Sequence, residues 1–309
     1  MRTLDTRRGT YELDHFDLWN RRDHEPSARK LLAPGARVVV MGSCFARDAV
    51  GYLRTRGYRA RRYPAGHLYN PHVIRLELEH VLGGGEWPSD VVLDASEGVA
   101  HRYRKLAAVN RAQLLERDRE ATEQARKLLG DADLLLVVFG TTAEVWRDRD
   151  AGLPTNEIPP PETHRRGSWQ VDEGDLEAIR GDLARTQALV GENLSAAQVY
   201  AVCPIPLYAT WLDRHIVDAN GRSKALLRAA LDLELGPEAT YLPLWDWMQA
   251  QTGRWSPTRR DGRHLDRTGV NRIMLFAERF LATERVPPLP WSLRARARAS
   301  DALDRIRRR

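Results

Sequence analysis

The sequence predicts an α/β fold in which a parallel sheet is covered by helices on both faces. Short, unbroken apolar runs at 37–41 and 133–140 are typical of strands that are buried on both sides. These runs alternate with amphipathic helical stretches, which is the pattern that parallel sheets produce. The chain has 309 residues, of which 42% are hydrophobic, enough for one large domain or two small ones with a full-sized core.

The first part of the chain is expected to pass from a polar arm into alternating strands and helices. Residues 1–34 are polar and irregular, and Pro34-Gly35 closes this arm. A strand over 37–41 is followed by a helix that carries apolar residues at spacings of three and four and ends at Gly57. The next expected elements are a strand over 58–63, a helix over 71–82 with Pro near its start, and a loop or hairpin over 86–110.

The second part continues the alternation and contains one long interruption. Residues 147–174 hold four prolines and many charges, and they predict a long surface excursion of the kind that often forms a lid. The remaining expected elements are a charged helix (111–129), strands at 133–140, 197–202 and 240–244, and a closing amphipathic helix (269–283). The expected organisation is an arm (1–34), an α/β domain (35–285) with the 147–174 insertion, and a basic C-terminal tail (286–309).

Composition excludes several classes of protein. The ordinary apolar fraction excludes global disorder, and no apolar run reaches the roughly 18 residues that a membrane-spanning helix needs. The charged residues 1–8 are not followed by the apolar stretch that a secretory signal requires. Two cysteines, Cys44 and Cys203, are too few for a disulfide framework or a cysteine zinc site. We therefore expect a soluble, cytoplasmic protein that uses neither a metal nor a cofactor.

The positive charge of the chain is concentrated at its C-terminus. Residues 294–309 contain seven arginines and two aspartates, and so hold +5 of the formal net charge of +6. The rest of the chain is close to neutral, which disfavours nucleic acid as a partner. We interpret the tail as a solvated terminal helix with Leu293, Ala297, Leu303 and Ile306 partly packed. The alternative is that the tail docks on an anionic partner.

The first candidate for chemistry is Ser43, which directly follows the first predicted buried strand. Gly42 permits a tight turn from strand to helix, and Ser43 then lies near a helix N-terminus. Backbone N–H groups and the helix dipole favour a developing negative charge at that place. The alternative is a serine that only caps the helix, which is the commoner use of serine there.

The second candidate is the pair Asp261 and His264, which lies just ahead of the last predicted helix. An aspartate three residues before a histidine can place its carboxylate on the imidazole Nδ1, which leaves Nε2 free to take a proton from a serine. The alternative is a capping aspartate beside a surface histidine. Together with Ser43, the pair gives the chain order Ser, Asp, His, and the combination is a stronger signal than either part.

This constellation resembles the SGNH/GDSL hydrolase superfamily, whose first block is a glycine–serine turn of this type and whose last block is Asp-x-x-His. More closely, residues 42–46 spell Gly-Ser-Cys-Phe-Ala, the motif that names the GSCFA family. The resemblance runs from about residue 37 to residue 281, which is most of the chain. Further stretches that are similar to that family lie at 69–72, 139–146, 204–206, 223–225 and 241–243.

The resemblance implies a three-layer α/β/α, flavodoxin-like fold and serine-based acyl chemistry. Ser43 would be the nucleophile, His264 the general base, and Asp261 the residue that orients it. Superfamily members usually form the oxyanion hole from the serine N–H, a glycine N–H and an asparagine side chain after the third strand.

That asparagine is absent here, because Gly140, Thr141 and Thr142 follow the strand. Thr142 or Asn70 would take its place, and Gly66 would be the backbone donor. Gly140 and Glu144 complete the residues expected to bind substrate. His67 and His72 are expected at the surface by default, and the alternative is that they line the pocket.

The function expected from these residues is a serine-dependent ester hydrolase that acts on an O-acylated glycan or small metabolite through an acyl-enzyme. One alternative is an O-acyltransferase that uses the same triad, since hydrolysis and transfer need the same residues. A further alternative is a non-catalytic ligand-binding module, which is suggested by the absence of the usual oxyanion-hole asparagine. Both Cys44 and Cys203 are expected to be small core residues.

Overall fold

The computed structural model of the protein describes most of the chain from residue 30 onward and a short N-terminal hairpin. The described residues are 3–6, 9–12, 30–87, 91–141, 145–150, 152–167, 169–172, 174–207, 210, 212–251 and 264–306.

A five-stranded parallel sheet forms the centre of the fold. Its spatial order is β13 (Ala239–Tyr241), β12 (Ala197–Val202), β8 (Leu134–Phe139), β3 (Arg37–Gly42) and β4 (Arg59–Arg62), and all four neighbouring pairs are parallel. In chain order this arrangement reads 2-1-3-4-5 from the β4 edge, which is the flavodoxin-like order. The predicted parallel sheet is therefore confirmed.

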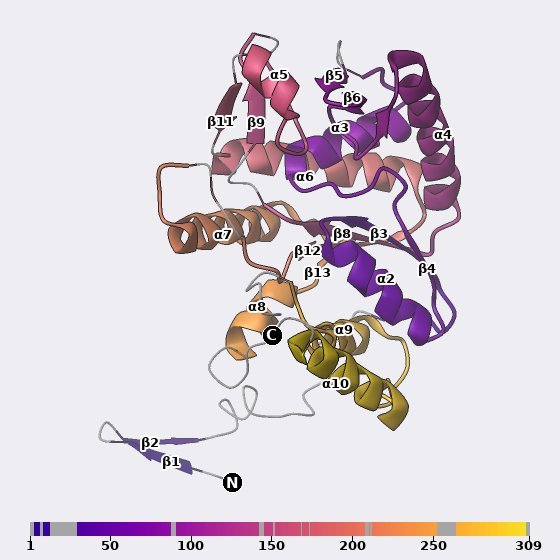
Figure 1. Ribbon diagram of the computed structural model, residues 1–309. Helices are drawn as coiled ribbons and strands as arrows, with labels where there is room; N and C mark the ends of the chain where they lie inside the picture. The colour runs from indigo at the N-terminus through magenta and orange to yellow at the C-terminus, as the bar shows by residue number, and fades with distance from the viewer. Residues whose placement is uncertain are drawn as a thin grey trace.

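Helices cover both faces of this sheet (Figure 1). Along β3, Val38 and Val40 pack into one core while Val39 and Met41 pack into the other, as expected for a strand buried on both sides. The predicted three-layer α/β/α architecture is confirmed. One layer contains α2 (Phe45–Thr55), α8 (Leu244–Gln251), α9 (Arg267–Leu281) and α10 (Trp291–Ile306); the other contains α3 (Pro71–Val81), α4 (Arg111–Gly130), α6 (Leu176–Asn193) and α7 (Ile216–Glu234).

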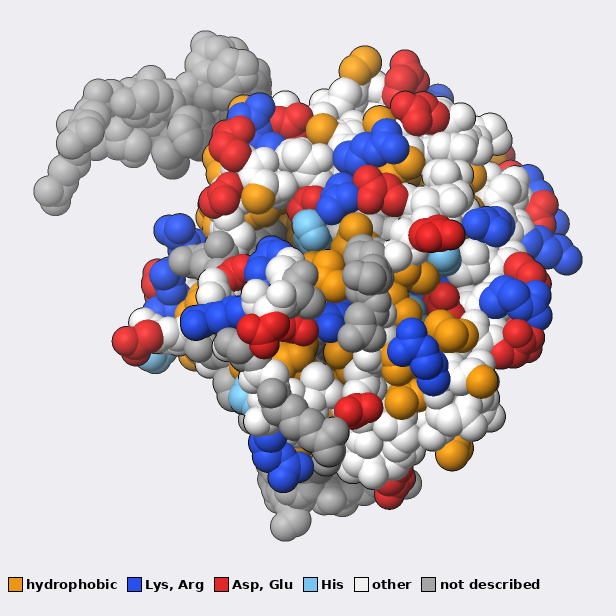
Figure 2. Space-filling view, turned by 90° about the horizontal axis from the view of Figure 1, so that it is seen from above, with side chains coloured by type: hydrophobic (Ala, Val, Ile, Leu, Met, Phe, Trp, Pro, Cys, Tyr) orange, Lys and Arg blue, Asp and Glu red, His pale blue; other side chains and the backbone are white. Residues whose placement is uncertain are grey.

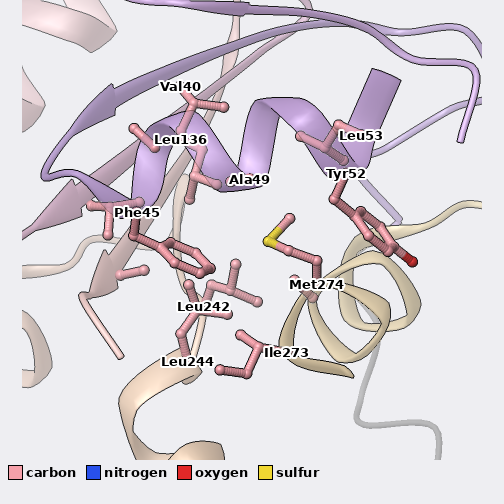
Figure 3. Close-up of a cluster of buried hydrophobic side chains, with 14 of the residues drawn as sticks. Val40, Phe45, Ala49, Tyr52, Leu53, Leu136, Leu242, Leu244, Ile273 and Met274 are labelled. Carbon is pink, nitrogen blue, oxygen red and sulfur yellow. The ribbon is translucent and has the colours of Figure 1, made fainter. Parts of the chain in front are cut away.

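The core between the sheet and the first helical layer holds α2 in place. Figure 3 shows Phe45 and Ala49 of α2 directed toward Ile273 and Met274 of α9, and all four side chains are buried. Each large apolar side chain buried in this way stabilises the fold by about 1.5–3 kcal/mol. Since α2 begins at Phe45, two residues after Ser43, this core also holds the end of the turn that carries Ser43.

The opposite core contains a fully buried arginine, Arg104, in the loop after β6. Its guanidinium contacts Glu77 of α3 at 2.7 Å and Asp118 of α4 at 2.7 Å, and it lies over the ring of Trp87. Burial alone would raise the pKa of Asp118, but the adjacent His101 ring and the charge of Arg104 lower it to about 2. This ion-pair network joins α3, α4 and the loop between them.

Helices α6 and α7 were not expected from the sequence. The buried side of α6 includes Thr186, and that of α7 includes Ser223 and Lys224, so polar residues interrupt the apolar periodicity of both helices. Tertiary packing outweighs the local pattern at these positions.

The predicted excursion at 147–174 is ordered, and it begins two residues earlier than expected. It forms the sheet β10 (Leu153–Pro154), β9 (Val145–Asp148), β11 (Trp169–Asp172) and a short helix, α5 (Pro161–Arg166). The hairpin expected within 86–110 is present as β5 (Val92–Ala95) and β6 (Gly98–His101), and β7 (Ala107–Ala108) adds a third strand to form a second small sheet. Both small sheets lie above the layer of α3 and α6 in Figure 1.

The arm and the tail are more regular than expected. Within the arm, β1 (Thr3–Thr6) and β2 (Gly9–Glu12) form an antiparallel hairpin. In the tail, Ala297 of α10 is 2% exposed, and Leu293 packs against the core beside α9. The side chains of Leu303 and Ile306 lie outside the described residues. No helix in the described part of the chain is long and apolar enough to cross a membrane.

Candidate functional site

The candidate site lies where the sheet connections change direction. The chain leaves β3 toward β4 on one side, and later returns to β8 on the other side of β3. In sheets of this type, ligands bind at the carboxyl ends of the two strands that flank this switch point. Ser43 follows β3 and the Gly140–Thr141 turn follows β8, so both face the same crevice.

The turn after β3 requires a glycine at position 42. Gly42 has φ +120°, and a Cβ atom there would lie 2.1 Å from the carbonyl oxygen of Val138 in β8. The same carbonyl accepts the Ser43 N–H at 3.0 Å. The turn is thus fixed to the neighbouring strand, and the Ser43 amide, expected as an oxyanion donor, is already engaged.

Ser43 itself is buried, with 1% of its surface exposed. Its Oγ makes no hydrogen bond to any described residue, His264 included. Residue 44 occupies the N-cap of α2 and makes no side-chain cap bond. The alternative role of Ser43 as a helix-capping serine is therefore not observed, and its hydroxyl is available for chemistry.

Gly140 lies directly against the candidate nucleophile. A Cβ atom on Gly140 would come within 3.2 Å of the Ser43 Cβ, so the close approach depends on a glycine. The N–H groups of Gly140 and Thr141 both donate to the Tyr69 carbonyl, at 2.8 and 3.0 Å. The Gly140 amide is therefore also engaged, and it forms part of the wall beside Ser43.

Helix α7 holds the other side of this turn. Lys224 donates from Nζ to the Gly140 carbonyl at 2.6 Å, and the hydroxyls of Thr141 and Ser223 lie 3.1 Å apart. Two successive residues of α7 thus contact two successive residues of the turn. Residues 223–225 are one of the stretches that resemble the family, and no role could be predicted for them. The contacts of Ser223 and Lys224 show that this stretch holds the Gly140–Thr141 turn.

The loop after β4 packs against the turn of Ser43. Leu68 donates its N–H to the Gly42 carbonyl at 2.9 Å. Asn156, from the excursion, accepts the Tyr69 N–H at 3.1 Å and donates to the His67 carbonyl at 2.6 Å. Asn156 therefore anchors the excursion to the site. This role of Asn156 was not predicted from the sequence, because a single asparagine in a polar stretch belongs to no recognisable motif.

Of the expected oxyanion donors, Asn70 and Gly66 retain unused donor groups. Asn70 is 1% exposed, and its Oδ1 caps α3 by accepting the Val73 N–H at 2.9 Å. Its Nδ2, like the Gly66 N–H, makes no hydrogen bond to a described residue. Thr142 and Glu144 lie outside the described residues, and so does Asp261.

His264 lies half-buried just before α9. The following residue, Leu265, is fully buried, which anchors the backbone there. The N-cap of α9 is Asp266, whose carboxylate accepts the Gly269 N–H, so the capping role considered for Asp261 belongs to another aspartate. The imidazole thus comes from the start of a packed helix, as expected.

A cavity of about 380 Å³ extends away from Asn70 between α3, α6 and the excursion. His72 lines it, which matches the alternative considered for this histidine, and the His72 Nδ1 lies 3.3 Å from Asp182. Arg147 and Asp172 of the excursion form an ion pair in its wall. The walls combine these polar groups with the apolar side chains of Val145, Val171 and Ile179.

Two cations near the site have no carboxylate partner among the described residues. Lys224 is 1% exposed, and its burial lowers its pKa, against which the thiols of Cys203 and Cys44 act weakly. Arg62, at the end of β4, has a buried Nε without a hydrogen-bond partner, and burial and the charge of Arg47 lower its pKa.

The site contains no obvious metal ligands, and its cysteines pack as expected. Among the described residues, no group of three or more His, Cys, Asp or Glu side chains could hold a metal ion. Cys203 is buried in the core beside α2 and α9, and Cys44 packs partly against the same core. On the face seen in Figure 2, acidic and basic side chains are interspersed, without a continuous basic surface.

Comparison with known proteins gives a single family assignment. No curated protein matches the chain. Residues 37–276, from β3 of the central sheet into α9, match the GSCFA family. The matched segment contains Ser43, His264 and every contact around the turn described above, and we conclude that the chain belongs to the GSCFA family.

Proposed function

We propose that this protein is a serine-dependent ester hydrolase of the SGNH type, acting on an O-acylated glycan or small metabolite. The observation that carries the proposal is the Ser43 hydroxyl, which is buried at the switch point of the sheet and makes no hydrogen bond to a described residue. A buried polar group without a partner is unfavourable, and such groups concentrate at functional sites.

In the proposed reaction, the Ser43 Oγ attacks the ester carbonyl and the hydroxyl proton passes to His264 Nε2. The tetrahedral intermediate collapses to an acyl-enzyme, and the leaving alcohol takes the proton back from His264. Water then attacks the acyl-enzyme by the same route and releases the acid. Asp261 orients the imidazole. Catalytic hydrogen bonds are often long in the absence of substrate, so the contact between Ser43 and His264 is expected to form when substrate binds.

The negative charge on the carbonyl oxygen is met by the donors that remain unused. The amides of Ser43 and Gly140 donate to backbone carbonyls, which leaves the Asn70 Nδ2 and the Gly66 N–H, with Thr142 as a further donor. Loss of one such donor typically lowers a rate by about 10²–10³. We therefore assign Asn70 two roles, helix cap and oxyanion donor.

An O-acyltransferase is the second candidate, and the ordered excursion favours it. Strands β9 and β11 line the 380 Å³ cavity next to Asn70, and Asn156 fixes the excursion to the loop beside Ser43. A structured cover over a cavity can bind an acceptor alcohol and limit the access of water. Shortening the excursion between residues 157 and 168 should then raise hydrolysis relative to transfer, and an unchanged ratio argues for a hydrolase.

Labelling with a fluorophosphonate probe tests the proposal. The wild-type protein should label at Ser43, the Ser43→Ala variant should not, and His264→Ala should label at least about 100-fold more slowly. Ser195→Ala, which changes an exposed serine, is the matched control and should label like the wild type. A correctly folded wild-type protein that does not label supports the remaining alternative, a non-catalytic ligand-binding module.

A further inference from the structure

Lys224 is a buried cation that, among the described residues, lacks the carboxylate partner that the buried guanidinium groups of Arg104 and Arg56 possess. Its side chain is 1% exposed, and no described carboxylate lies within ion-pair distance of it. By contrast, Arg104 contacts Glu77 and Asp118, and Arg56 contacts Glu278 at 2.8 Å. A buried charge without a partner normally destabilises a fold, so Lys224 requires an explanation other than stability.

The ammonium group of Lys224 is held close to the proposed nucleophile. Its Nζ donates to the Gly140 carbonyl at 2.6 Å, and the Cβ position of Gly140 lies 3.2 Å from the Ser43 Cβ. With standard backbone dimensions, these two contacts place the Lys224 Nζ within about 9 Å of the Ser43 Cβ. The path between them is the Gly140–Thr141 turn.

The surroundings of Lys224 allow it to carry its charge. Burial lowers the pKa of Lys224, but the Gly140 carbonyl oxygen accepts its hydrogen bond and the ring of Trp245 lies 5.6 Å from Nζ. A carbonyl dipole and an aromatic face both stabilise an ammonium ion. The neighbouring Cys203 and Cys44 side chains act against burial and raise the pKa of Lys224.

We propose that Lys224 is a positioning residue that supplies positive charge to the acyl site. Its ammonium, fixed on the Gly140 carbonyl, stabilises the negative charge that develops on the substrate carbonyl oxygen when Ser43 attacks. Lys224 forms no bond to the substrate and exchanges no proton in this role. At about 9 Å and the effective dielectric constant usual in proteins, such a charge accounts for a ten- to twenty-fold change in rate. The inference rests on the proposed serine chemistry.

The test compares the rate of fluorophosphonate labelling at Ser43 in the wild type, Lys224→Met and Lys127→Met. Methionine keeps the length and the apolar stem of lysine and removes the charge. Lys127 is an exposed lysine of α4, and its variant controls for the loss of one positive charge from the whole protein. The midpoint of urea unfolding is measured for each protein, and rates are referred to the folded fraction.

We expect Lys224→Met to label ten- to twenty-fold more slowly than the wild type and to unfold at the same or a higher urea concentration. Lys127→Met should label at the wild-type rate. A purely structural lysine predicts the opposite pair of results, a lower unfolding midpoint and an unchanged rate for the folded fraction, and this outcome overturns the inference. A variant that does not fold also overturns it. If the wild type does not label at Ser43, the proposed function fails and the inference fails with it; equal labelling of wild type and Lys224→Met removes the inference alone.

Discussion

Replacing Gly42 by alanine tests the turn that places Ser43. A Cβ atom at this position would lie 2.1 Å from the Val138 carbonyl oxygen and 2.8 Å from its carbonyl carbon. Both atoms belong to the backbone of β8, in the middle of the sheet. They can move only if the ladder between β3 and β8 is disturbed, so the clash cannot be relieved by a side-chain rotation.

The expected loss of stability has two parts. Alanine at a positive φ costs about 1–2 kcal/mol relative to glycine, and forcing an extra methyl group into a packed region costs about a further 1–3 kcal/mol. Gly57→Ala is a matched control, because Gly57 has φ +89° but no atom within 4 Å of its Cβ position. The control should lose only the first part, about 1–2 kcal/mol, while Gly42→Ala should lose about 2–5 kcal/mol.

Urea unfolding followed by tryptophan fluorescence measures both variants, since the chain contains nine tryptophans. The free energies of unfolding should differ by about 2 kcal/mol between the two variants. Equal losses for Gly42→Ala and Gly57→Ala would show that β3 can retreat from β8 without penalty. In that case the close contact is not what requires glycine in the turn, and our account of how Ser43 is held is wrong.

Three further predictions concern buried polar groups. The pKa of Asp118 is about 2 in the folded protein against 3.8 ordinarily, so its ionised form contributes about 2 kcal/mol to the free energy of unfolding above pH 4, and this contribution is lost as the pH falls toward 2. In an acid-unfolding titration, Asp118→Asn should not show this pH-dependent loss of stability. Glu278 accepts hydrogen bonds from Tyr52 and Arg56 in the core, and Glu278→Gln should lower the free energy of unfolding by about 3 kcal/mol, with the exposed Glu192→Gln unchanged in the same urea titration. Asn70→Asp keeps the cap of α3 but removes the Nδ2 donor; it should unfold like the wild type and label with fluorophosphonate about 10²-fold more slowly, whereas equal labelling would remove Asn70 from the oxyanion site.

The centre of the sheet could be predicted from the sequence because β3 and β8 are nearly pure apolar runs, whereas the edge strand β4 contains three arginines. Every residue of β8 is buried, and a run of leucine and valine leaves little choice of structure. Helices α6 and α7 could not be predicted in the same way, since Thr186 and Lys224 occupy buried positions for reasons that lie outside those helices. The spacing of apolar residues predicts which side of a helix packs against an apolar surface. It does not predict a polar residue that is buried because it contacts another part of the fold.

The residues of the candidate site likewise divide into those that a local motif predicts and those that only the folded structure reveals. Ser43, Gly42 and Gly140 could be predicted because each lies at a strand end within a short motif. The role of Asn156 could not, because its partners at His67 and Tyr69 are 89 and 87 residues away in the chain. The hydrogen bond from the Ser43 N–H to the Val138 carbonyl could not be predicted either, because it depends on the register of β3 against β8.

The hydrogen bonds that hold Ser43 in place also limit how it can react. The Ser43 N–H donates to β8, the Leu68 N–H donates to the Gly42 carbonyl, and the Gly140 N–H donates to the Tyr69 carbonyl. These bonds interlock three segments and position the hydroxyl before substrate arrives, but they use backbone donors that could otherwise stabilise an oxyanion. A site built in this way must meet negative charge mainly with side chains. The chemistry of this protein should therefore be more sensitive to changes at Asn70 and Lys224 than that of a site whose oxyanion hole consists of free backbone amides.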